Sequence, residues 1–420
     1  MDIGELILYT VSYFGLFCAI FFLVTLIENR KQIKNPKAPK ELPKVTIMVP
    51  ACNEEQCLAK TVESLLELDY PKEKLQIIVI DDGSTDKTLK IARSYEKRGV
   101  LVLTKPNGGK GTALNLGLKH AKGEFVGCLD ADSIVEPDAL KKMIGYFRKK
   151  SVMAVTPSLK CTRPKTIWQR IQVIEFLLGV YLRKVFSYLG SIHVTPGPFT
   201  IFRKEFFDRY GGYDTSTCTE DIEIALRIQS NRYEIENAVD ANVYAVAMPT
   251  FTPLKKQRVR WYKGFLENIG KYKHLFKPQY GNLGLFVLPS AFVSIMTAAT
   301  IVAYTIYMSI KTNYQRAVNL YNVNFDIWRL IDLDWDWFYI NQSPLMMIGL
   351  VSLVLGITMV YLAKRMSREE MHLSYAYILF MVFYLPLYVY WWGLAIKARI
   401  KNKDVGWVGR KRKEVEIKYA

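Results

Sequence analysis

The sequence predicts an α/β domain inserted between membrane-spanning helices, and three observations support this fold class. Between Val45 and Leu129, short apolar runs typical of buried strands alternate with helical segments. Continuous apolar strands between helices are typical of a parallel sheet that is covered on both faces. Long apolar runs lie on either side of this region, and polar residues gather at the ends of its predicted strands, where such sheets bind ligands.

About four apolar runs are long enough to cross a bilayer. They are Glu5–Ile27, Leu283–Ile310, Leu345–Ala363 and Leu373–Ile396. The first run is too long for a signal-peptide core and no small-residue cleavage site follows it, so we expect a retained anchor. The protein is therefore expected in the cell membrane, as a multi-pass protein.

The charge distribution predicts the orientation of the chain in the membrane. Basic residues crowd the C-terminal side of the first run, whereas Asp2 and Glu5 lie at its start. Because Lys and Arg favour the cytoplasmic side, we expect the N-terminus outside and the α/β domain in the cytoplasm. The loop Lys311–Pro344 is acidic and aromatic, as suits an external loop; it contains Asp332, Asp334, Trp335, Asp336 and Trp337.

The C-terminal tail conflicts with a simple count of four spans. Four spans would place the basic segment Lys401–Lys418 outside, against the charge rule. Either one late segment is interfacial or re-entrant, or the rule fails here. The candidates for such a segment are Leu283–Ile310 and Leu373–Ile396, which contains Pro386. We favour an interfacial or re-entrant segment.

Composition excludes some classes of function. The net charge of +18 is mostly membrane-surface charge with a share for phosphate binding, and no nucleic-acid-binding motif accompanies it. We therefore expect membrane lipid, and no nucleic acid, among the partners. The six cysteines have no zinc-finger spacing and none lies in the predicted external loop, so reduced thiols are expected.

Two acidic residues, Asp130 and Asp132, follow the predicted strand Phe125–Leu129. Side chains two apart in a strand share a face, and two carboxylates with substrate phosphates are a usual Mg²⁺ or Mn²⁺ arrangement. Alone, the pair is equally compatible with a solvated loop in which Asp132 caps a helix at Pro137–Lys149. Other polar residues are expected at the same edge of the sheet, and the set comprises Asn53, Glu54, Asp82, Lys110, Asp130 and Asp132.

The glycine-rich segment Lys105–Gly111 lies between a predicted strand and a helix. Its backbone N–H groups are suited to bind a phosphate at the helix start, with Lys110 as a point charge. No Ser or Thr directly follows Lys110, so this is not a Walker loop. Without further context, a simple glycine-rich turn is the favoured explanation of the segment.

Two segments outside the sheet region have helical spacing of apolar residues. Thr166–Ile192 is too charged to span a membrane and predicts an interfacial helix, with a packed amphipathic core helix as the alternative. A helix near Leu254–Phe265 places Gln257, Arg260 and Trp261 on one face. Taken alone, that face suits a basic and aromatic membrane anchor.

Acidic residues also open a predicted helix in Thr219-Glu220-Asp221. Thr219 suits a helix N-cap, and acids in a first turn are favoured by the helix dipole. Helix capping is therefore a sufficient explanation for either acid by itself.

Four motifs in this order, inside membrane helices, resemble the membrane-embedded family 2 glycosyltransferases, which include cellulose, hyaluronan, chitin and poly-N-acetylglucosamine synthases. The motifs are Asp81-Asp82-Gly83-Ser84, Asp130-Ala131-Asp132, Thr219-Glu220-Asp221 and Gln257-Arg258-Val259-Arg260-Trp261. The resemblance covers roughly Val45 to Gly264. It implies a GT-A fold, a UDP-sugar donor, a divalent cation (Mn²⁺ or Mg²⁺), inverting transfer to a saccharide, and extrusion of a polymer through the membrane helices.

The resemblance also implies roles for individual residues. Ala51, Glu54 and Asp82 would contact the uridine, and Lys110 would lie near it or the diphosphate. Asp130 would lie by the ribose and the metal, and Asp132 would be the main metal ligand. Asp221, in Thr219-Glu220-Asp221, would be the general base beside Glu220. Arg258 or Arg260 would neutralise the leaving diphosphate, and the acceptor would contact Gln257, Trp261 and Phe199.

These expectations divide the chain into five parts. A transmembrane helix covers residues 1–28, a basic linker 29–44, the GT-A domain 45–275, a C-terminal membrane region 281–398 and a basic tail 399–420. The GT-A domain includes interfacial helices at about 166–192 and 254–275. With one N-terminal span, the pore would be minimal or completed by a second copy in a homo-oligomer. The tail segment Trp407-Val408-Gly409-Arg410 is similar to a Trp–Arg motif near the end of hyaluronan synthases.

Two other functions remain open from the sequence. One is a non-processive transferase that adds a single sugar to a lipid-linked acceptor, which would use the same Asp132 and Asp221. The other is a membrane transporter or scaffold with a degenerate nucleotide-binding domain, which the presence of Asp82, Asp132, Asp221 and Arg260 disfavours. The motifs do not reveal the sugar, because donor choice depends on a few pocket contacts.

Overall fold

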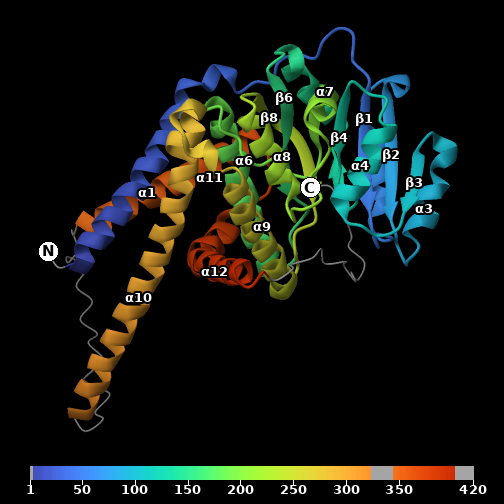
Figure 1. Cartoon of the computed structure of the whole chain (residues 1–420). Helices are drawn as coiled ribbons and strands as arrows, with labels where there is room; N and C mark the ends of the chain where they lie inside the picture. Colours follow the sequence, from blue (N-terminus) through green and yellow to red (C-terminus); the bar gives the residue numbers. More distant parts are fainter. Residues whose placement is uncertain (1–2, 323–343, 403–420) are drawn as a thin grey trace.

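The computed structural model describes residues 3–322 and 344–402, and within them an eight-stranded sheet forms the centre of the α/β domain (Figure 1). The strands lie in the order β3-β2-β1-β4-β7-β6-β8-β5. Their bounds are β1 Val45–Ala51, β2 Leu75–Asp82, β3 Leu101–Lys105, β4 Phe125–Cys128, β5 Ser133–Val135, β6 Val152–Cys161, β7 Thr200–Arg203 and β8 Glu234–Ala245.

The four strands predicted between Val45 and Leu129 are parallel, as expected. β1 pairs in parallel with β2 and β4, and β2 with β3. Beyond β4 the sheet is mixed: β7 is antiparallel to β4 and β6, β5 is antiparallel to β8, and β6 is parallel to β8. The sequence did not reveal this change, because an apolar run that is buried on both faces has no signal for strand direction.

Helices cover both faces of the sheet, and two hydrophobic cores result. Ile47 and Val49 of β1 pack into one core, whereas Met48 between them packs into the other. This alternation follows from the two-residue period of a strand. The covering helices are α2 Leu58–Leu66, α3 Thr88–Ser94, α4 Lys110–His120, α5 Ala139–Ile144, α7 Lys204–Tyr210 and α8 Glu220–Ser230.

The turn after β4 differs from the sequence-based prediction. β4 ends at Cys128, so Asp130 and Asp132 lie in a turn before β5 and do not share the face of a strand. The helix expected at Pro137–Lys149 is shorter, with α5 at Ala139–Ile144 and Asp138 at its N-cap. Asp132 is therefore not the cap of this helix, although it does lie in a turn after the strand, as the alternative expected.

Two long amphipathic helices, α6 Ile167–Tyr188 and α9 Phe251–Lys271, confirm the helices predicted at Thr166–Ile192 and near Leu254–Phe265. Thr166 and Gln169 form a capping box, which fixes where α6 begins. α6 packs against β6 and β8 on one side and against apolar helices α11 Pro344–Met366 and α12 Ser374–Ile400 on the other. It thus joins the α/β domain to the apolar helices.

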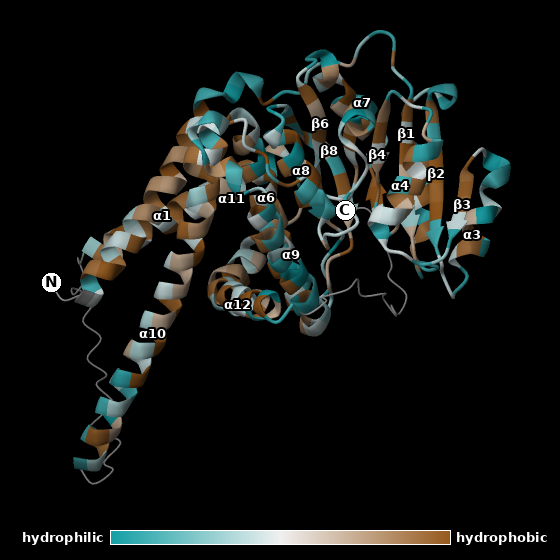
Figure 2. Ribbon diagram, in the orientation of Figure 1, coloured by the Kyte–Doolittle hydropathy of each residue, from teal (hydrophilic) through white to brown (hydrophobic). Residues whose placement is uncertain are grey.

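Four described helices are long and apolar enough to cross a membrane: Gly4–Glu28 in α1, Leu283–Asn322 with α10, Pro344–Met366 and Ser374–Ile400. The bounds of α1 are Ile3–Glu28, and those of α10 are Leu288–Asn322. Figure 2 shows hydrophobic residues along α1 and along the half of α10 nearest the domain, and more hydrophilic residues at the far end of α10. The predicted external loop Lys311–Pro344 is wrong in its first part, because residues 311–322 continue α10. Residues 323–343 of that loop and the C-terminal tail from residue 403 lie outside the described residues.

One apolar helix has a different direction from the others. Figure 1 shows α1 and α10 lengthwise, whereas α12 is seen nearly along its axis. α12 packs mainly against α9 and α6, and the rings of Tyr262 in α9 and Trp392 in α12 stack with centroids 4.6 Å apart. α12 therefore lies against the two amphipathic helices rather than alongside α1.

Candidate active site

One cavity of about 480 Å³ joins the carboxyl edge of the sheet to the apolar helices. Five acidic residues line it: Asp130, Asp132, Glu175, Glu220 and Asp221. Residues of α9 also line it, namely Gln257, Arg260 and Trp261. The cavity ends among side chains of α10 and α12, which are Ala291, Ser294, Ile295, Tyr388 and Trp392. It therefore brings together three of the four motifs on which the family resemblance was based.

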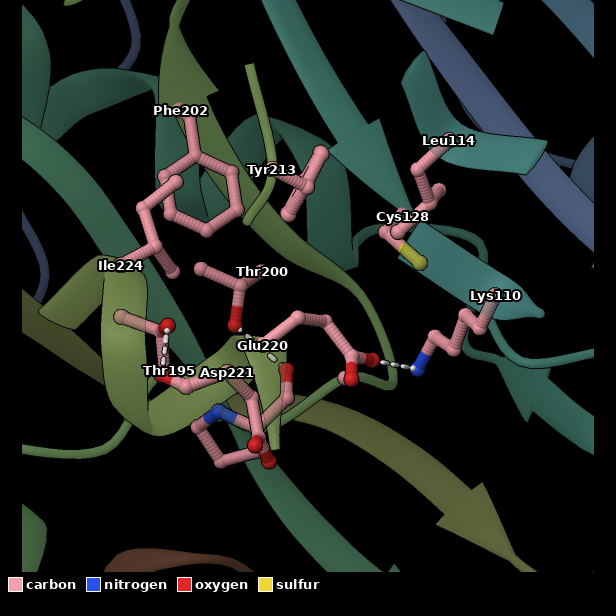
Figure 3. A pocket seen from close by; sticks show the side chains of 12 residues that line it. Lys110, Leu114, Cys128, Thr195, Thr200, Phe202, Tyr213, Glu220, Asp221 and Ile224 are labelled. Atoms are coloured by element: carbon pink, nitrogen blue, oxygen red, sulfur yellow. Dashed lines mark hydrogen bonds and ion pairs between the residues drawn. The ribbon is translucent and has the colours of Figure 1, made fainter. Parts of the chain in front are cut away.

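Lys110, the first residue of α4, forms ion pairs with acids of two of these segments. Its Nζ lies 2.6 Å from Asp130 Oδ1 and 3.0 Å from Glu220 Oε1, and Figure 3 shows it pointing at Glu220. Burial would lower the pKa of Lys110, but the two carboxylates outweigh burial and raise that pKa well above its ordinary value. A Cβ at Gly197 would lie 2.5 Å from Lys110 Nζ, so a larger residue there would displace the end of the Lys110 side chain.

The pKa values of the two acids at the start of α8 are shifted in opposite directions. Burial and the neighbouring Glu220 carboxylate raise the pKa of Asp221 to about 6. Burial also acts to raise the pKa of Glu220, but the charges of Lys110 and Arg260 lower it below its ordinary value. Two adjacent carboxyl groups whose pKa values are pushed apart are typical of acid–base sites. Glu220 is thus held as an ion-pair partner, and Asp221 is the group suited to exchange a proton.

The backbone of Asp221 is held more firmly than its carboxylate. Thr195 donates from both its N–H and its hydroxyl to the carbonyl oxygen of Asp221, at 3.1 and 2.8 Å (Figure 3). The carboxylate accepts the N–H of Ile222 at 3.0 Å. Thr195 was not among the predicted site residues, and its place directly before Pro196-Gly197-Pro198 was its only signal.

Asp130 and Asp132 fit a divalent cation only if the substrate supplies further ligands. In residues 3–322 and 344–402 no three His, Cys, Asp or Glu side chains gather as a metal site. Both carboxylates face the same cavity, and Asp130 already faces Lys110. Mg²⁺ and Mn²⁺ are commonly held by one or two carboxylates together with phosphate oxygens, which suits this pair.

The face of α9 predicted from the spacing of Gln257, Arg260 and Trp261 is the face that lines the cavity. Arg260 also donates to the carbonyl oxygen of Cys218, at 3.3 Å, and so contacts the segment before α8. Gly264, one turn further along α9, packs on Thr219, where a Cβ would clash. The close contact between α8 and α9 places the two motifs on one cavity.

Arg258 is placed differently from the expectation that it would bind the donor. It is fully buried, donates to Glu175 of α6, and its guanidinium lies 4.2 Å from the ring centroid of Trp261. It does not line the cavity. A residue two positions from Arg260 on a helix points about 200° away, which explains the difference. Arg258 supports Trp261, and Arg260 is the arginine that faces the site.

Phe199, expected to line the acceptor side, is fully buried in the core of the sheet. Its N–H donates to the carbonyl oxygen of Cys128, which continues the pairing of β7 with β4. The cavity is lined instead by the residues before it, Pro196, Gly197 and Pro198. The assignment of Phe199 to the acceptor site is therefore corrected: it belongs to the core.

Ala51, Glu54 and Asp82 lie together at the ends of β1 and β2, but none of them lines the cavity. Asp82 Oδ1 and Oδ2 accept the N–H groups of Gly108 and Gly109 at 3.0 and 2.8 Å, and Lys105 Nζ lies 2.7 Å from Oδ1. Asp82 thereby holds the glycine-rich turn in place. The sequence analysis did not predict Lys105 as the partner of Asp82. In the parallel pairing of β2 with β3, Asp82 lies directly opposite Lys105.

The fold and the site together define a GT-A glycosyltransferase domain flanked by apolar helices. A mannosyltransferase from Pyrobaculum calidifontis, solved in complex with GDP-Man and Mn²⁺, has the same fold with a TM-score of 0.56. It is 21% identical in sequence, and the match covers 88% of this chain and 100% of that one. At this identity the likeness shows the fold alone.

Residues 46–211 match the model of the glycosyl transferase family 2. The chain therefore carries a family 2 glycosyltransferase domain. It is 35% identical over 225 residues to poly-beta-1,6-N-acetyl-D-glucosamine synthase from Staphylococcus epidermidis, and 34% identical over 229 residues to the Staphylococcus aureus protein of the same name. These matches cover 52% and 53% of this chain and 54% and 55% of the relatives, so they span about half of each relative.

Proposed function

We propose that this protein is an inverting, cation-dependent glycosyltransferase that uses a UDP-sugar and extends a saccharide which enters the membrane region. The observation that carries the proposal is the single cavity that runs from Asp132 and Asp221 past Trp261 to α10 and α12. A donor at the carboxylates and an acceptor along α9 would meet beside Asp221. The names of the staphylococcal relatives favour UDP-N-acetylglucosamine as the first donor to test.

The mechanism assigns a different task to each charged group. The Asp221 carboxylate accepts the proton of the acceptor hydroxyl as that oxygen attacks the sugar carbon, and one base is enough for inversion. Arg260 of α9 stabilises the negative charge that develops on the leaving nucleoside diphosphate. Lys110 fixes Asp130 and Glu220, and a Mn²⁺ or Mg²⁺ at Asp130 and Asp132 would neutralise diphosphate charge.

Trp261 is suited to hold the acceptor. One face of its ring is covered by the Arg258 guanidinium, and the side chain lines the cavity. An aromatic face binds a sugar ring without requiring one pattern of hydroxyl groups, so it can hold each new chain end in turn. The continuation of the cavity to Ser294 and Tyr388 supports passage of a product toward the membrane helices.

We infer that the α/β domain is cytoplasmic, with the N-terminus outside, because basic residues follow α1. The direction of α12 and its packing on α6 and α9 favour α12 as the interfacial late segment (Figure 1). Three spans would then return the basic tail to the cytoplasm, which resolves the conflict in the charge pattern. Lipid contacts along these helices and a homo-oligomer that completes the pore belong to the same proposal.

The proposal is tested by incubating the purified full chain with a panel of UDP-sugars, with Mn²⁺ or with EDTA, and sizing the products. We expect turnover of one donor, loss of turnover in EDTA, and products of many sugars. Undiminished activity in EDTA would refute the cation assignment. Turnover of no donor, with binding intact, would favour the transporter or scaffold alternative.

Transfer of a single sugar to a lipid-linked acceptor is the second candidate function. One observation favours it: Arg183 presents an unpaired cation to the same cavity that contains Asp221. A neutral saccharide offers no charge to match this residue. A product with one sugar on a lipid would support this candidate over a polysaccharide.

A further inference from the structure

Arg183 belongs to a stripe of α6 that forms one wall of the cavity. The stripe follows helical spacing and comprises Gln172, Glu175, Phe176, Gly179 and Arg183. Arg183 was not singled out in the sequence, where it is one of several charged residues on an amphipathic helix. Its neighbour Lys184 points elsewhere, toward Tyr146 and the backbone of Asn237.

Two of the three guanidinium nitrogens of Arg183, a half-buried residue, are buried without a partner in the described part of the chain. These atoms, Nε and Nη2, are inaccessible to solvent and have no hydrogen-bond acceptor among the described residues. Burial lowers the pKa of Arg183 to about 10, so the side chain remains charged at neutral pH. A buried charge without a counter-ion is unfavourable. Binding of an anion at this guanidinium would therefore be favourable.

The other described cations that line this cavity have partners: Lys110 faces Asp130 and Glu220, and Arg260 donates to the carbonyl oxygen of Cys218. Arg258, which lies against Trp261 and outside the cavity lining, faces Glu175. The Arg183 guanidinium folds back over Gly179, where a Cβ would lie 3.3 Å from Nη1. Gly179 thus leaves room for the planar group against the helix backbone and keeps the guanidinium at the cavity wall.

Apolar side chains lie on one side of Arg183, toward the candidate membrane spans, although polar residues line the rest of the cavity. Phe186, one turn further along α6, contacts Phe22 of α1 with ring centroids 5.6 Å apart. The same cavity is lined by Ala291 and Ile295 of α10, within a candidate span. An anion that reaches Arg183 from this side would be carried by a lipid.

We propose that Arg183 binds the phosphate of a lipid, so that the cavity has a second anion subsite separate from the one for the donor diphosphate. The planar fork of a guanidinium matches two phosphate oxygens, which a lysine cannot do. The phosphate comes either from a lipid-phosphate acceptor or from a phospholipid headgroup at the mouth of the cavity. The first source would make this subsite part of acceptor recognition, and that version rests on the proposed glycosyltransferase function.

Lipid binding tests the proposal without any need for activity. Purified, delipidated full chain is titrated with farnesyl phosphate and with farnesol, and separately with phosphatidylglycerol and an uncharged galactolipid, and bound lipid is counted by native mass spectrometry. We expect the phosphate member of at least one pair to bind better, and Arg183→Gln to weaken that binding about tenfold or more. Preference for farnesyl phosphate identifies a lipid-phosphate acceptor, and preference for phosphatidylglycerol identifies a headgroup.

Two control variants separate this role from a structural one. Arg170 lies on the same helix with its guanidinium over the ring of Tyr375, outside the cavity, so Arg170→Gln should leave lipid binding unchanged. Arg183→Lys keeps the charge and should retain part of the binding. Equal lipid binding by wild type and Arg183→Gln would overturn the proposal. So would a loss of UDP-sugar affinity in Arg183→Gln with lipid binding unchanged, because Arg183 would then serve the donor.

A failure of the proposed function has a different signature. If the wild type turns over no UDP-sugar yet binds a phosphate lipid through Arg183, the transferase assignment fails and the subsite stands. If the wild type transfers sugar but Arg183→Gln binds both lipid pairs as well as wild type, the subsite fails and the transferase stands.

Discussion

Asp82 and Asp221 are both acidic residues at the carboxyl edge of the sheet, yet their surroundings differ. Both oxygens of Asp82 are occupied by backbone N–H groups of the glycine-rich turn, and Lys105 neutralises its charge. Asp221 accepts one backbone N–H, faces the cavity and has a raised pKa. The difference shows that one acid, Asp82 at the end of β2, holds a loop in place, whereas another, Asp221 in the first turn of α8, remains available for chemistry. Only their surroundings tell the two apart.

The largest expected effect on the transfer rate is that of replacing Asp221, the acid that we assign to the chemical step. Asp221→Asn should lower the transfer rate by about 10²–10⁴, because the amide cannot accept the hydroxyl proton. Affinity for the UDP-sugar should stay within about twofold, since the side-chain shape is retained. Single-turnover rates and donor titration measure the two quantities. A variant that transfers at the wild-type rate would reduce Thr219-Glu220-Asp221 to the start of a helix.

Arg258 and Arg260 offer a matched pair on one helix. Arg260→Ala should lower the transfer rate by about 10²–10³ with little loss of stability, because it removes a positive charge from the leaving group. Arg258→Ala should mainly lower the melting temperature, because it leaves Glu175 without its buried partner. Transfer rates and melting temperatures of both variants, measured in detergent, test these two expectations. A large loss of transfer rate in Arg258→Ala, with a lower melting temperature only in Arg260→Ala, would mean that Arg258 binds the donor.

Trp261→Ala should shorten the product while nucleotide binding is unchanged. The ring lines the cavity and is the group expected to hold the chain end between transfers. Product length is measured by gel or mass spectrometry at equal amounts of inserted protein. Loss of membrane insertion with normal product length would mean that Trp261 is an anchor.

Asp82→Ala should have its main effect on stability and on donor affinity rather than on the chemical step. Loss of the carboxylate removes the acceptor of two partly exposed backbone N–H groups and the ion-pair partner of Lys105, at a cost of about 1–2 kcal/mol. The melting temperature should fall by several degrees, and the donor dissociation constant should rise. A lower transfer rate at saturating donor, with unchanged melting temperature, would place Asp82 with Asp221 among the chemical groups.

The sequence predicted the features that depend on local pattern. The strand–helix alternation from Val45 to Leu129, the long apolar helices and the shared face of Gln257, Arg260 and Trp261 all follow from period and spacing, and the structure confirms them. The TM-score of 0.56 to a solved glycosyltransferase and the family 2 match confirm the predicted fold and family resemblance.

What the sequence could not reveal depends on long-range contacts. The antiparallel insertion of β7 buries Phe199, and the contact of α6 with α9 turns Arg258 toward Glu175. The ion pairs of Lys110 join residues 110, 130 and 220, which no local window contains. The unpaired state of Arg183 is visible only when all its neighbours are known.

The pH dependence of transfer tests the central claim that Asp221 is the base. With its pKa at about 6, Asp221 is mostly ionised at pH 7 and becomes protonated as the pH falls, so it loses the ability to accept a proton. The account predicts that kcat/KM for the acceptor is level near pH 7 and falls about tenfold per pH unit below about pH 6. The residual activity of Asp221→Asn should lack this fall. A wild-type profile that stays level to pH 5, or the same fall in the variant, would contradict the assignment.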